Sequence, residues 1–163
     1  MKYISSDTNV WLDFQEIGRT DLPFRLSCTY IMYKEALKKE IISPPELIDE
    51  LIRRGLVGVE LTVDELFYAL DIAKKYAKLS DFDRTALAIA KFRNMPLLTG
   101  DNPLRKAAKK EGVEVFGTIG LLDKLYAGEL INKLEYKYCL ESLLEHKERR
   151  LPVDELKKRI ESL

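Results

Sequence analysis

Short β-prone runs alternate with helical patterns along most of this 163-residue chain, and this alternation limits its fold more than any other feature. The run MPLLTGD at 95–101 is apolar until it ends in a turn, and VGVEL at 57–61 is short and β-branched. Strands that are apolar on both faces are typical of parallel sheets covered by helices on each side. The sequence therefore predicts an α/β fold of three layers, with helices flanking a mostly parallel central sheet of about four or five strands.

Local signals place the individual elements. The clearest is a helix over 79–94, where Ser80 and Asp83 have the spacing of a capping box. Within the segment 42–55, a helix starts after Pro44 and Pro45 and stops at Gly55. Further strands are predicted at 2–6, 24–27 and 113–117, and further helices at 9–17, 30–40, 63–77, 102–112 and 118–130.

The end of the chain differs from the rest. From about residue 132 the pattern is helical and highly charged, and Pro152 divides it. We therefore expect a catalytic-type domain over 1–130 and a helical C-terminal extension over 131–163, packed on that domain or on a partner.

Composition excludes several classes of protein. Lys+Arg and Asp+Glu both number 27, so any affinity for a polyanion must come from local patches and not from net charge. Cys28 and Cys139 form no CxxC pair and His146 is the only histidine, which argues against the usual zinc site. No run approaches the roughly 20 apolar residues of a membrane span, so we expect no membrane partner. A reducing, cytoplasmic location is the simplest prediction.

Two aspartates directly follow predicted strands. Asp7 comes after KYISS, and Asp101 comes after MPLLTG. Ligands of open parallel sheets bind beyond the carboxyl ends of the strands. If both strands are central and parallel, these two side chains point into the same crevice.

Two further carboxylates are candidates for the same crevice. Asp83 shares a helical face with Ala86 and Ala90, and a carboxylate at the start of a buried stripe is unusual. Glu35 lies among apolar residues on the helix predicted at 30–40. Its rivals are Glu46, Asp49 and Glu50, although their helix has a solvent-facing acidic side.

A cluster of this kind favours a bound cation. At about 4 Å and an effective dielectric near 20, a pair of like charges costs on the order of 4 kcal/mol. The cluster must therefore take up protons or bind a cation. Oxygen ligands select Mg²⁺ or Mn²⁺, and such ions activate water and neutralise charge on a phosphodiester.

Four segments resemble the signature blocks of the PIN-domain family, over roughly residues 1–125. They are SDTNVW at 6–11, KEAL at 34–37, LSDFDRTALAIA at 79–90 and LLTGDNPLRKAA at 97–108. The resemblance implies a Mg²⁺- or Mn²⁺-dependent endoribonuclease acting on RNA. It also implies kinship with toxins of toxin–antitoxin pairs, which commonly form homodimers and are blocked by an antitoxin protein. The implied carboxylates are Asp7, Glu35, Asp83 and Asp101, with Asn9 and Thr99 as supporting polar residues.

Each candidate residue also has a structural explanation. Asp7, Asp83 and Asp101 lie near predicted helix starts, where aspartate caps free N–H groups. Glu35 could be a solvated carboxylate paired with a nearby lysine. Arg105 and Lys106, close to Asp101, are candidate contacts for RNA phosphates or simply a solvated helix face.

Two other classes of function stay open from the sequence alone. One is a non-catalytic PIN-like module that binds RNA or a protein. The other is a phosphatase or phospho-acceptor domain, which also places an aspartate after its first strand. The sequence Asp7-Thr8-Asn9 lacks the second aspartate of an Asp-x-Asp motif, which weighs against a phosphatase of that type.

Overall fold

A computed structural model describes residues 2–41, 44–149 and 151–163 of the chain. Within them, five strands form one sheet in the order β3-β2-β1-β4-β5, and every neighbouring pair is parallel. The predicted α/β fold with a parallel central sheet is therefore confirmed. The strands are β1 (Lys2–Ser6), β2 (Cys28–Tyr33), β3 (Val57–Val59), β4 (Leu97–Leu98) and β5 (Val115–Phe116).

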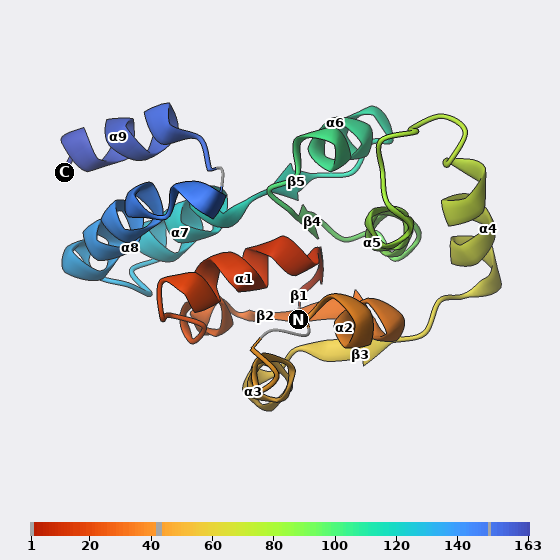
Figure 1. The fold of residues 1–163 in the computed structure, drawn as a ribbon, viewed down its shortest axis with the longest axis horizontal. Coiled ribbons are helices and arrows are strands. Elements are labelled where there is room, and N and C mark those ends of the chain that lie inside the picture. The colour runs from red at the N-terminus through yellow and green to blue at the C-terminus, as the bar shows by residue number, and fades with distance from the viewer. Residues whose placement is uncertain (1, 42–43, 150) are drawn as a thin grey trace.

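Helices surround this sheet (Figure 1). The described residues form nine α-helices and two short 3₁₀ helices. The α-helices are α1 (Thr8–Glu16), α2 (Lys34–Glu40), α3 (Leu47–Arg54), α4 (Val63–Asp71), α5 (Asp81–Phe92), α6 (Asn102–Lys110), α7 (Thr118–Ala127), α8 (Lys133–Glu145) and α9 (Val153–Glu161). The 3₁₀ helices are η1 (Leu22–Arg25) and η2 (Lys147–Arg149).

The two residues of β4 show how the layers are built. Successive side chains of a strand point to opposite faces of the sheet. Leu97 packs in a cluster with residues of α5 and α6, whereas Leu98 packs in a larger cluster with residues of α1, α7 and α8. Helices therefore cover both faces, which explains why this strand is apolar at consecutive positions.

An aromatic group anchors α1 to the sheet. The Trp11 ring stacks on Phe24 at 5.3 Å between centroids and meets Tyr30 edge-on at 5.1 Å. The Tyr30 hydroxyl donates a hydrogen bond to the Pro23 carbonyl, at 2.6 Å. These contacts fix the direction in which α1 leaves β1, and hence the position of the residues between them.

The helices after residue 130 belong to the same packed body. Tyr136, Leu140 and Leu143 of α8 are buried in the larger core cluster. Arg159 of α9 makes a charged pair with Asp123 of α7, with Nη2 and Oδ2 2.8 Å apart. The division at residue 130 stays a prediction, but α8 completes the core on this face of the sheet.

Arg149 makes a second connection between the end of the chain and its beginning. Its Nε lies 2.6 Å from Oδ1 of the buried Asp13, and its Nη2 donates to the Asn9 carbonyl at 3.1 Å. Thr118 donates to the other Asp13 oxygen, also at 2.6 Å. The Asp13 carboxylate thus links α1 to η2 and α7, and Arg149 also contacts the first turn of α1.

Several predicted elements differ from the structure, and the strands predicted at 57–61 and 113–117 are both shorter than expected. The strand predicted at 24–27 is wrong, because Leu22–Arg25 form the 3₁₀ helix η1, with Pro23 in its first turn, and the strand follows at Cys28–Tyr33. The helix predicted at 30–40 begins only at Lys34. The helix predicted at 63–77 is shorter and ends at Asp71. In the segment 42–55, residues 42–43 lie outside the described part of the chain, and α3 begins after the two prolines and ends before Gly55 as expected.

Among the described residues, no helix combines the length and apolar character needed to cross a lipid bilayer.

Candidate metal centre

Asp7 and Asp101 meet at the carboxyl ends of neighbouring strands. Ser6 of β1 pairs with Leu98 of β4, and the Asp7 N–H donates to the Leu98 carbonyl at 2.9 Å. Thr99 connects the two acids: its hydroxyl donates to Asp7 Oδ2 at 2.9 Å and accepts from the Asp101 N–H at 3.1 Å. The structure thus brings together two residues that are far apart in the sequence.

Asp83 approaches the same edge from α5. It occupies the third position of the helix in a capping box: the Ser80 N–H donates to its carboxylate at 2.9 Å, and its own N–H donates to Ser80 Oγ at 3.1 Å. The charge of Asp83 raises the pKa of Asp7, and the charge of Asp101 raises the pKa of Asp83. The three aspartates therefore form one electrostatically connected group.

All three aspartates also cap helices. Asp7 accepts from the Thr8 N–H at 2.8 Å, and Asp101 accepts from the Leu104 N–H at 3.0 Å. Each of these caps uses one carboxylate oxygen and leaves further lone pairs free. Capping and ligand binding are therefore compatible at this edge.

Glu40 supplies a fourth carboxylate, which the sequence patterns did not indicate. It ends α2, and its Oε1 accepts a hydrogen bond from the Thr8 hydroxyl at 2.7 Å. Its charge also raises the pKa of Asp7. We refer to Asp7, Glu40, Asp83 and Asp101 as the acidic edge.

Glu35 lies elsewhere. Its side chain is 42% exposed and pairs with Lys39 at 3.8 Å, which is the solvated arrangement that its sequence neighbours also allowed. Helical spacing distinguishes the two glutamates. Glu40 lies four residues after Ala36 and three after Leu37, and both of these residues are buried. It therefore shares their inward face, whereas Glu35 does not.

Burial and like charge strongly disfavour ionisation of Asp7. The residue is only 5% exposed. Burial raises the pKa of its carboxyl to about 7, and Asp83 and Glu40 add to the rise, while the hydrogen bonds from Thr99 and Thr8 oppose it. Burial and then Asp101 likewise raise the pKa of Asp83. A divalent cation at this edge would relieve both effects, so the donor set fits such an ion.

The carboxylate oxygens of the acidic edge are spread apart in this structure. Its donor oxygens do not form a group in which three lie within 4.8 Å of one another; in the described part of the chain that spacing occurs at Glu16, His146 and Glu148. This second group is largely exposed on α1 and around η2, away from the ends of the strands. It is a set of candidate ligands, but no other feature of the described residues there indicates a bound ion.

The other candidate residues differ in how they are held near the acidic edge. Arg105 donates to the Thr99 carbonyl at 3.2 Å, which holds it beside Asp101, whereas Lys106 is exposed on the next position of α6. Asn9 is exposed, and its carbonyl accepts a hydrogen bond from Arg149.

Arg84 also lies close to this edge. It pairs with Asp81, and its charge lowers the pKa of Asp83. Among the described side chains, Arg84 Nε is the buried polar atom without a partner. A positive charge on α5 therefore offsets part of the repulsion among the acids.

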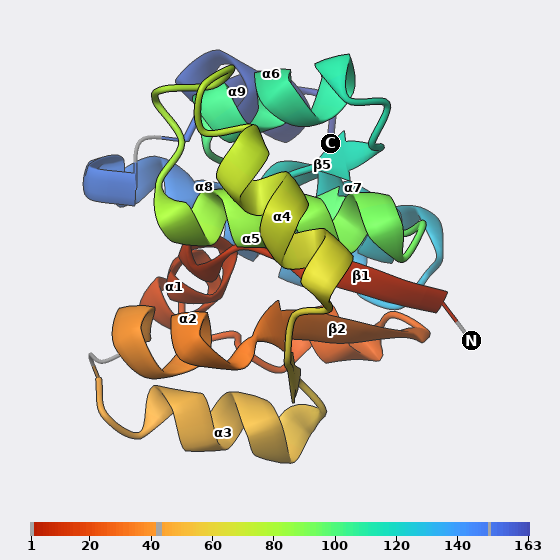
Figure 2. The same ribbon diagram turned by 90° about the vertical axis from the view of Figure 1, so that its right-hand side faces the viewer.

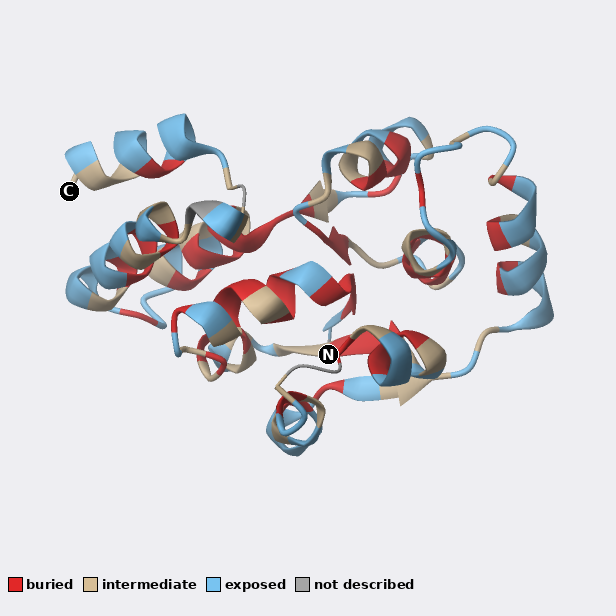
Figure 3. Cartoon of the chain, in the orientation of Figure 1, coloured by how far each residue is buried: buried red, intermediate tan, exposed pale blue. Residues whose placement is uncertain are grey.

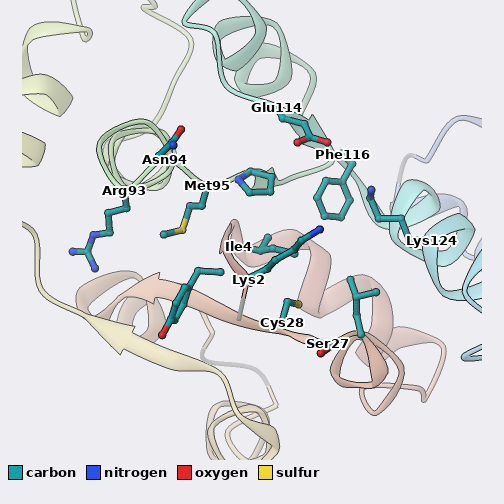
Figure 4. Close-up of a pocket in the computed structure, with 13 residues that line it drawn as sticks. Lys2, Ile4, Ser27, Cys28, Arg93, Asn94, Met95, Glu114, Phe116 and Lys124 are labelled. Atoms are coloured by element: carbon teal, nitrogen blue, oxygen red, sulfur yellow. The ribbon is translucent and has the colours of Figure 1, made fainter.

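A larger cavity lies at the opposite end of the sheet (Figure 4). It has a volume of about 960 Å³ and is lined at the amino ends of β1, β2 and β4 by Lys2, Cys28 and Met95, among others. The small cavity at the acidic edge, about 10 Å³, is lined by residues that include Asp7 and Glu40. The volume of a cavity therefore does not identify the candidate site. The coupled carboxylates lie at the carboxyl ends of the strands, beside the smaller cavity.

The fold and the acidic edge together define an α/β domain of the nuclease type. A family model for the PIN domain matches residues 3–163, so the chain belongs to the PIN-domain family and has its nuclease fold. No curated protein and no solved structure gives a significant match to the chain.

Proposed function

We propose that this protein is a Mg²⁺- or Mn²⁺-dependent endoribonuclease that hydrolyses RNA phosphodiester bonds at the acidic edge. The observation that carries the proposal is that Thr99 links the buried Asp7 to Asp101, while burial and the charges of Asp83 and Glu40 raise the pKa of Asp7. Membership of the PIN-domain family supports the same class of reaction.

The proposed ligands are Asp7, Asp83 and Asp101, with Glu40 in place of Glu35 as the fourth acid. A divalent cation bound there supplies positive charge against the phosphodiester and lowers the pKa of water. The chain's own part is to hold its acids in position. Asp7 is fixed through both oxygens, by the Thr8 N–H and the Thr99 hydroxyl.

Arg105 and Lys106 are proposed to meet phosphates on either side of the cleaved bond. Arg105 is fixed beside the acidic edge by its hydrogen bond to the Thr99 carbonyl. Lys106 can reach an extended strand because it is exposed. Such local contacts would offset the absence of a net positive charge.

The direct test is cleavage of a fluorescent single-stranded RNA by the full chain during titration with Mn²⁺ or Mg²⁺. We expect cleavage that EDTA abolishes and that Asp83→Asn removes, because asparagine keeps the helix cap but loses the charge. RNA binding without turnover under both metals would support the non-catalytic module instead. Release of phosphate from a small phosphoester, without RNA cleavage, would support the phosphatase.

The role of toxin in a toxin–antitoxin pair is part of this proposal and rests on the family resemblance. It predicts that induced expression stops growth and that Asp83→Asn relieves the arrest. A neighbouring reading frame for a small DNA-binding-type protein would identify the antitoxin, and its co-expression should restore growth.

A further inference from the structure

A cavity at the carboxyl ends of β4 and β5 borders the acidic edge. It has a volume of about 370 Å³, within the roughly 300–1,000 Å³ of ligand pockets. Gly100 and Asn102 line it after β4, and Gly117 lines it after β5. Residues of the C-terminal segment between Leu151 and Arg159 line it as well, so we refer to it as the α9 cavity.

The α9 cavity continues the acidic edge along the end of the sheet. Asp101 lies between Gly100 and Asn102 in the chain, so the cavity begins beside one of the proposed ligands. In the sheet, β4 has β1, which leads to Asp7, on one side and β5 on the other. Because neighbouring strands are only about 4.8 Å apart, an RNA strand bound across Asp7 and Asp101 can continue directly into the cavity.

The wall that the C-terminal segment contributes is held in a fixed position. Leu156 of α9 is 1% exposed in the core, and Arg159 pairs with Asp123 of α7. Figure 2 shows α9 on the same side of the molecule as α6, and Figure 3 shows that the outer side of α9 is exposed. The C-terminal helix is therefore a docked part of the cavity and not a loose tail.

Arg105 supplies donors for a phosphate group. It lines the cavity, and its Nη1 donates to the Thr99 carbonyl at 3.2 Å, which leaves the N–H groups of Nε and Nη2. Glycine at position 117 allows this placement, because a Cβ there would lie 2.7 Å from Nη1. A guanidinium that is fixed in this way and keeps further N–H groups is suited to phosphate oxygens.

Arg159 supplies a flat surface for a base. Its Nε and Nη2 donate to the Asp123 carboxylate at 2.9 and 2.8 Å, and its Nη1 donates to the Glu155 carbonyl at 3.1 Å. These bonds lie along the edge of the guanidinium plane, so its faces stay available for stacking. Unpaired RNA bases stack on arginine planes as they do on aromatic rings. Pro152, which also lines the cavity, adds apolar surface.

Glu155 indicates which way a nucleotide lies in the cavity. Its exposed side chain lines the cavity one helical turn before Arg159. Its carboxylate repels a phosphate group, whereas Arg105 attracts one. The phosphate therefore belongs beside Arg105, and the base belongs beside α9.

We propose that the α9 cavity holds one unpaired nucleotide of the RNA substrate next to the cleaved bond, with its phosphate on Arg105 and its base stacked on Arg159. The proposal rests on RNA being the substrate of the acidic edge. It gives the C-terminal helix a role in selecting single strands, because a base that is paired and stacked in a duplex cannot enter the cavity.

Binding of labelled single-stranded and duplex RNA, followed by fluorescence anisotropy, tests the stacking. Every protein carries Asp83→Asn, so that the RNA stays intact in Mn²⁺. Arg159→Lys keeps the charge opposite Asp123 but loses the plane, and should raise the Kd for the single strand about 5-fold. It should leave duplex binding unchanged. Lys158→Gln, at an exposed position of α9 outside the cavity lining, is the control and should affect both RNAs equally.

Glu155→Gln tests the same cavity with the opposite sign. Loss of this carboxylate should lower the Kd for the single strand by roughly 2- to 5-fold. Glu161→Gln removes an exposed acid from the same helix outside the cavity lining and should have a smaller effect. Urea unfolding of each variant checks that α9 stays docked. Equal effects at positions 155 and 161, or equal single-strand affinity for Arg159→Lys and its parent, would overturn the proposal.

The cavity and the nuclease can fail separately. Metal-dependent cleavage by the wild-type chain, together with unchanged binding by the Arg159 and Glu155 variants, would remove the cavity and keep the nuclease. The predicted changes in single-strand binding, without cleavage under either metal, would keep the cavity as an RNA site and remove the nuclease.

Discussion

The Thr8 hydroxyl donates a hydrogen bond to Glu40, with Oγ1 and Oε1 2.7 Å apart. Thr8 directly follows Asp7, so this bond ties the end of α2 to the start of α1 beside the most buried acid of the site. It distinguishes Glu40 from Glu35, the glutamate of the same helix that the sequence patterns favoured.

Glu40→Gln and Glu35→Gln should therefore differ sharply. We expect Glu40→Gln to lower RNA cleavage by about 10- to 100-fold, as the loss of a group that supports a metal site does. Glu35→Gln removes a surface pair with Lys39, worth under about 1 kcal/mol, and should leave cleavage unchanged. Initial rates at saturating Mn²⁺ measure both. The reverse order of effects would return the assignment to Glu35.

The raised pKa of Asp7 predicts that metal-free stability depends on pH. The folded protein keeps a proton on Asp7 up to about pH 7, whereas the unfolded chain releases it near 3.8. The contribution of Asp7 to the free energy of unfolding therefore falls as pH rises from about 4 to about 7, by up to about 4 kcal/mol.

Urea unfolding of the wild type and Asp7→Asn in EDTA measures this dependence. The variant should gain stability over the wild type as pH rises through this window, and the gain should level off above it. Excess Mn²⁺ should reduce the difference by stabilising only the wild type. A difference that is constant with pH would show that Asp7 ionises normally.

Thr99 should act on the site through Asp7. Thr99→Val removes a buried donor to Asp7 Oδ2 and an acceptor for the Asp101 N–H, and should cost about 1–3 kcal/mol of stability. It should also raise the Mn²⁺ concentration needed for half-maximal cleavage, because Asp7 loses one of the bonds that orient it. Thr99→Ser keeps the hydroxyl and is the control. Equal metal requirements in both variants would contradict a positioning role.

Arg149 should matter for folding far more than a surface arginine does. Arg149→Ala leaves the buried Asp13 with Thr118 as its remaining side-chain partner, and should cost about 3 kcal/mol. Arg54→Ala, which breaks a half-exposed pair with Glu50, should cost under about 1 kcal/mol. Denaturant midpoints compare the two. Adding Asp13→Asn to Arg149→Ala should recover part of the loss.

Much of the fold could be predicted because its signals are local. The capping box of Ser80 and Asp83 marks the start of α5, and it is present as predicted. The apolar run before Asp101 predicted a strand buried on both faces, and Leu97 and Leu98 are fully buried on opposite faces. Because the two strands are parallel, their carboxyl ends then bring Asp7 and Asp101 to the same edge of the sheet.

Other features depend on contacts that no local pattern encodes. The 3₁₀ helix η1, with Pro23 in its first turn, overlaps the segment where the sequence suggested a strand, and β2 and the start of α2 lie further along the chain than expected. The sequence predicted a helix from residue 30, in which Glu35 lies among apolar residues, and this favoured Glu35 over Glu40. The pairing of Asp13 with Arg149 spans 136 positions and leaves no periodic signal in either segment.

The position of β1 has a consequence for the growing polypeptide. Of the five strands, β1 is synthesised first, yet it lies in the middle of the sheet. Its neighbour β4 is synthesised only after most of the chain. The contacts of Asp7 with Thr99, and through it with Asp101, can therefore form only after these later residues have left the ribosome. A chain interrupted before that point lacks Thr99 and Asp101 and so holds at most part of the acidic edge in place, which under the proposed function would leave unfinished copies without a complete site.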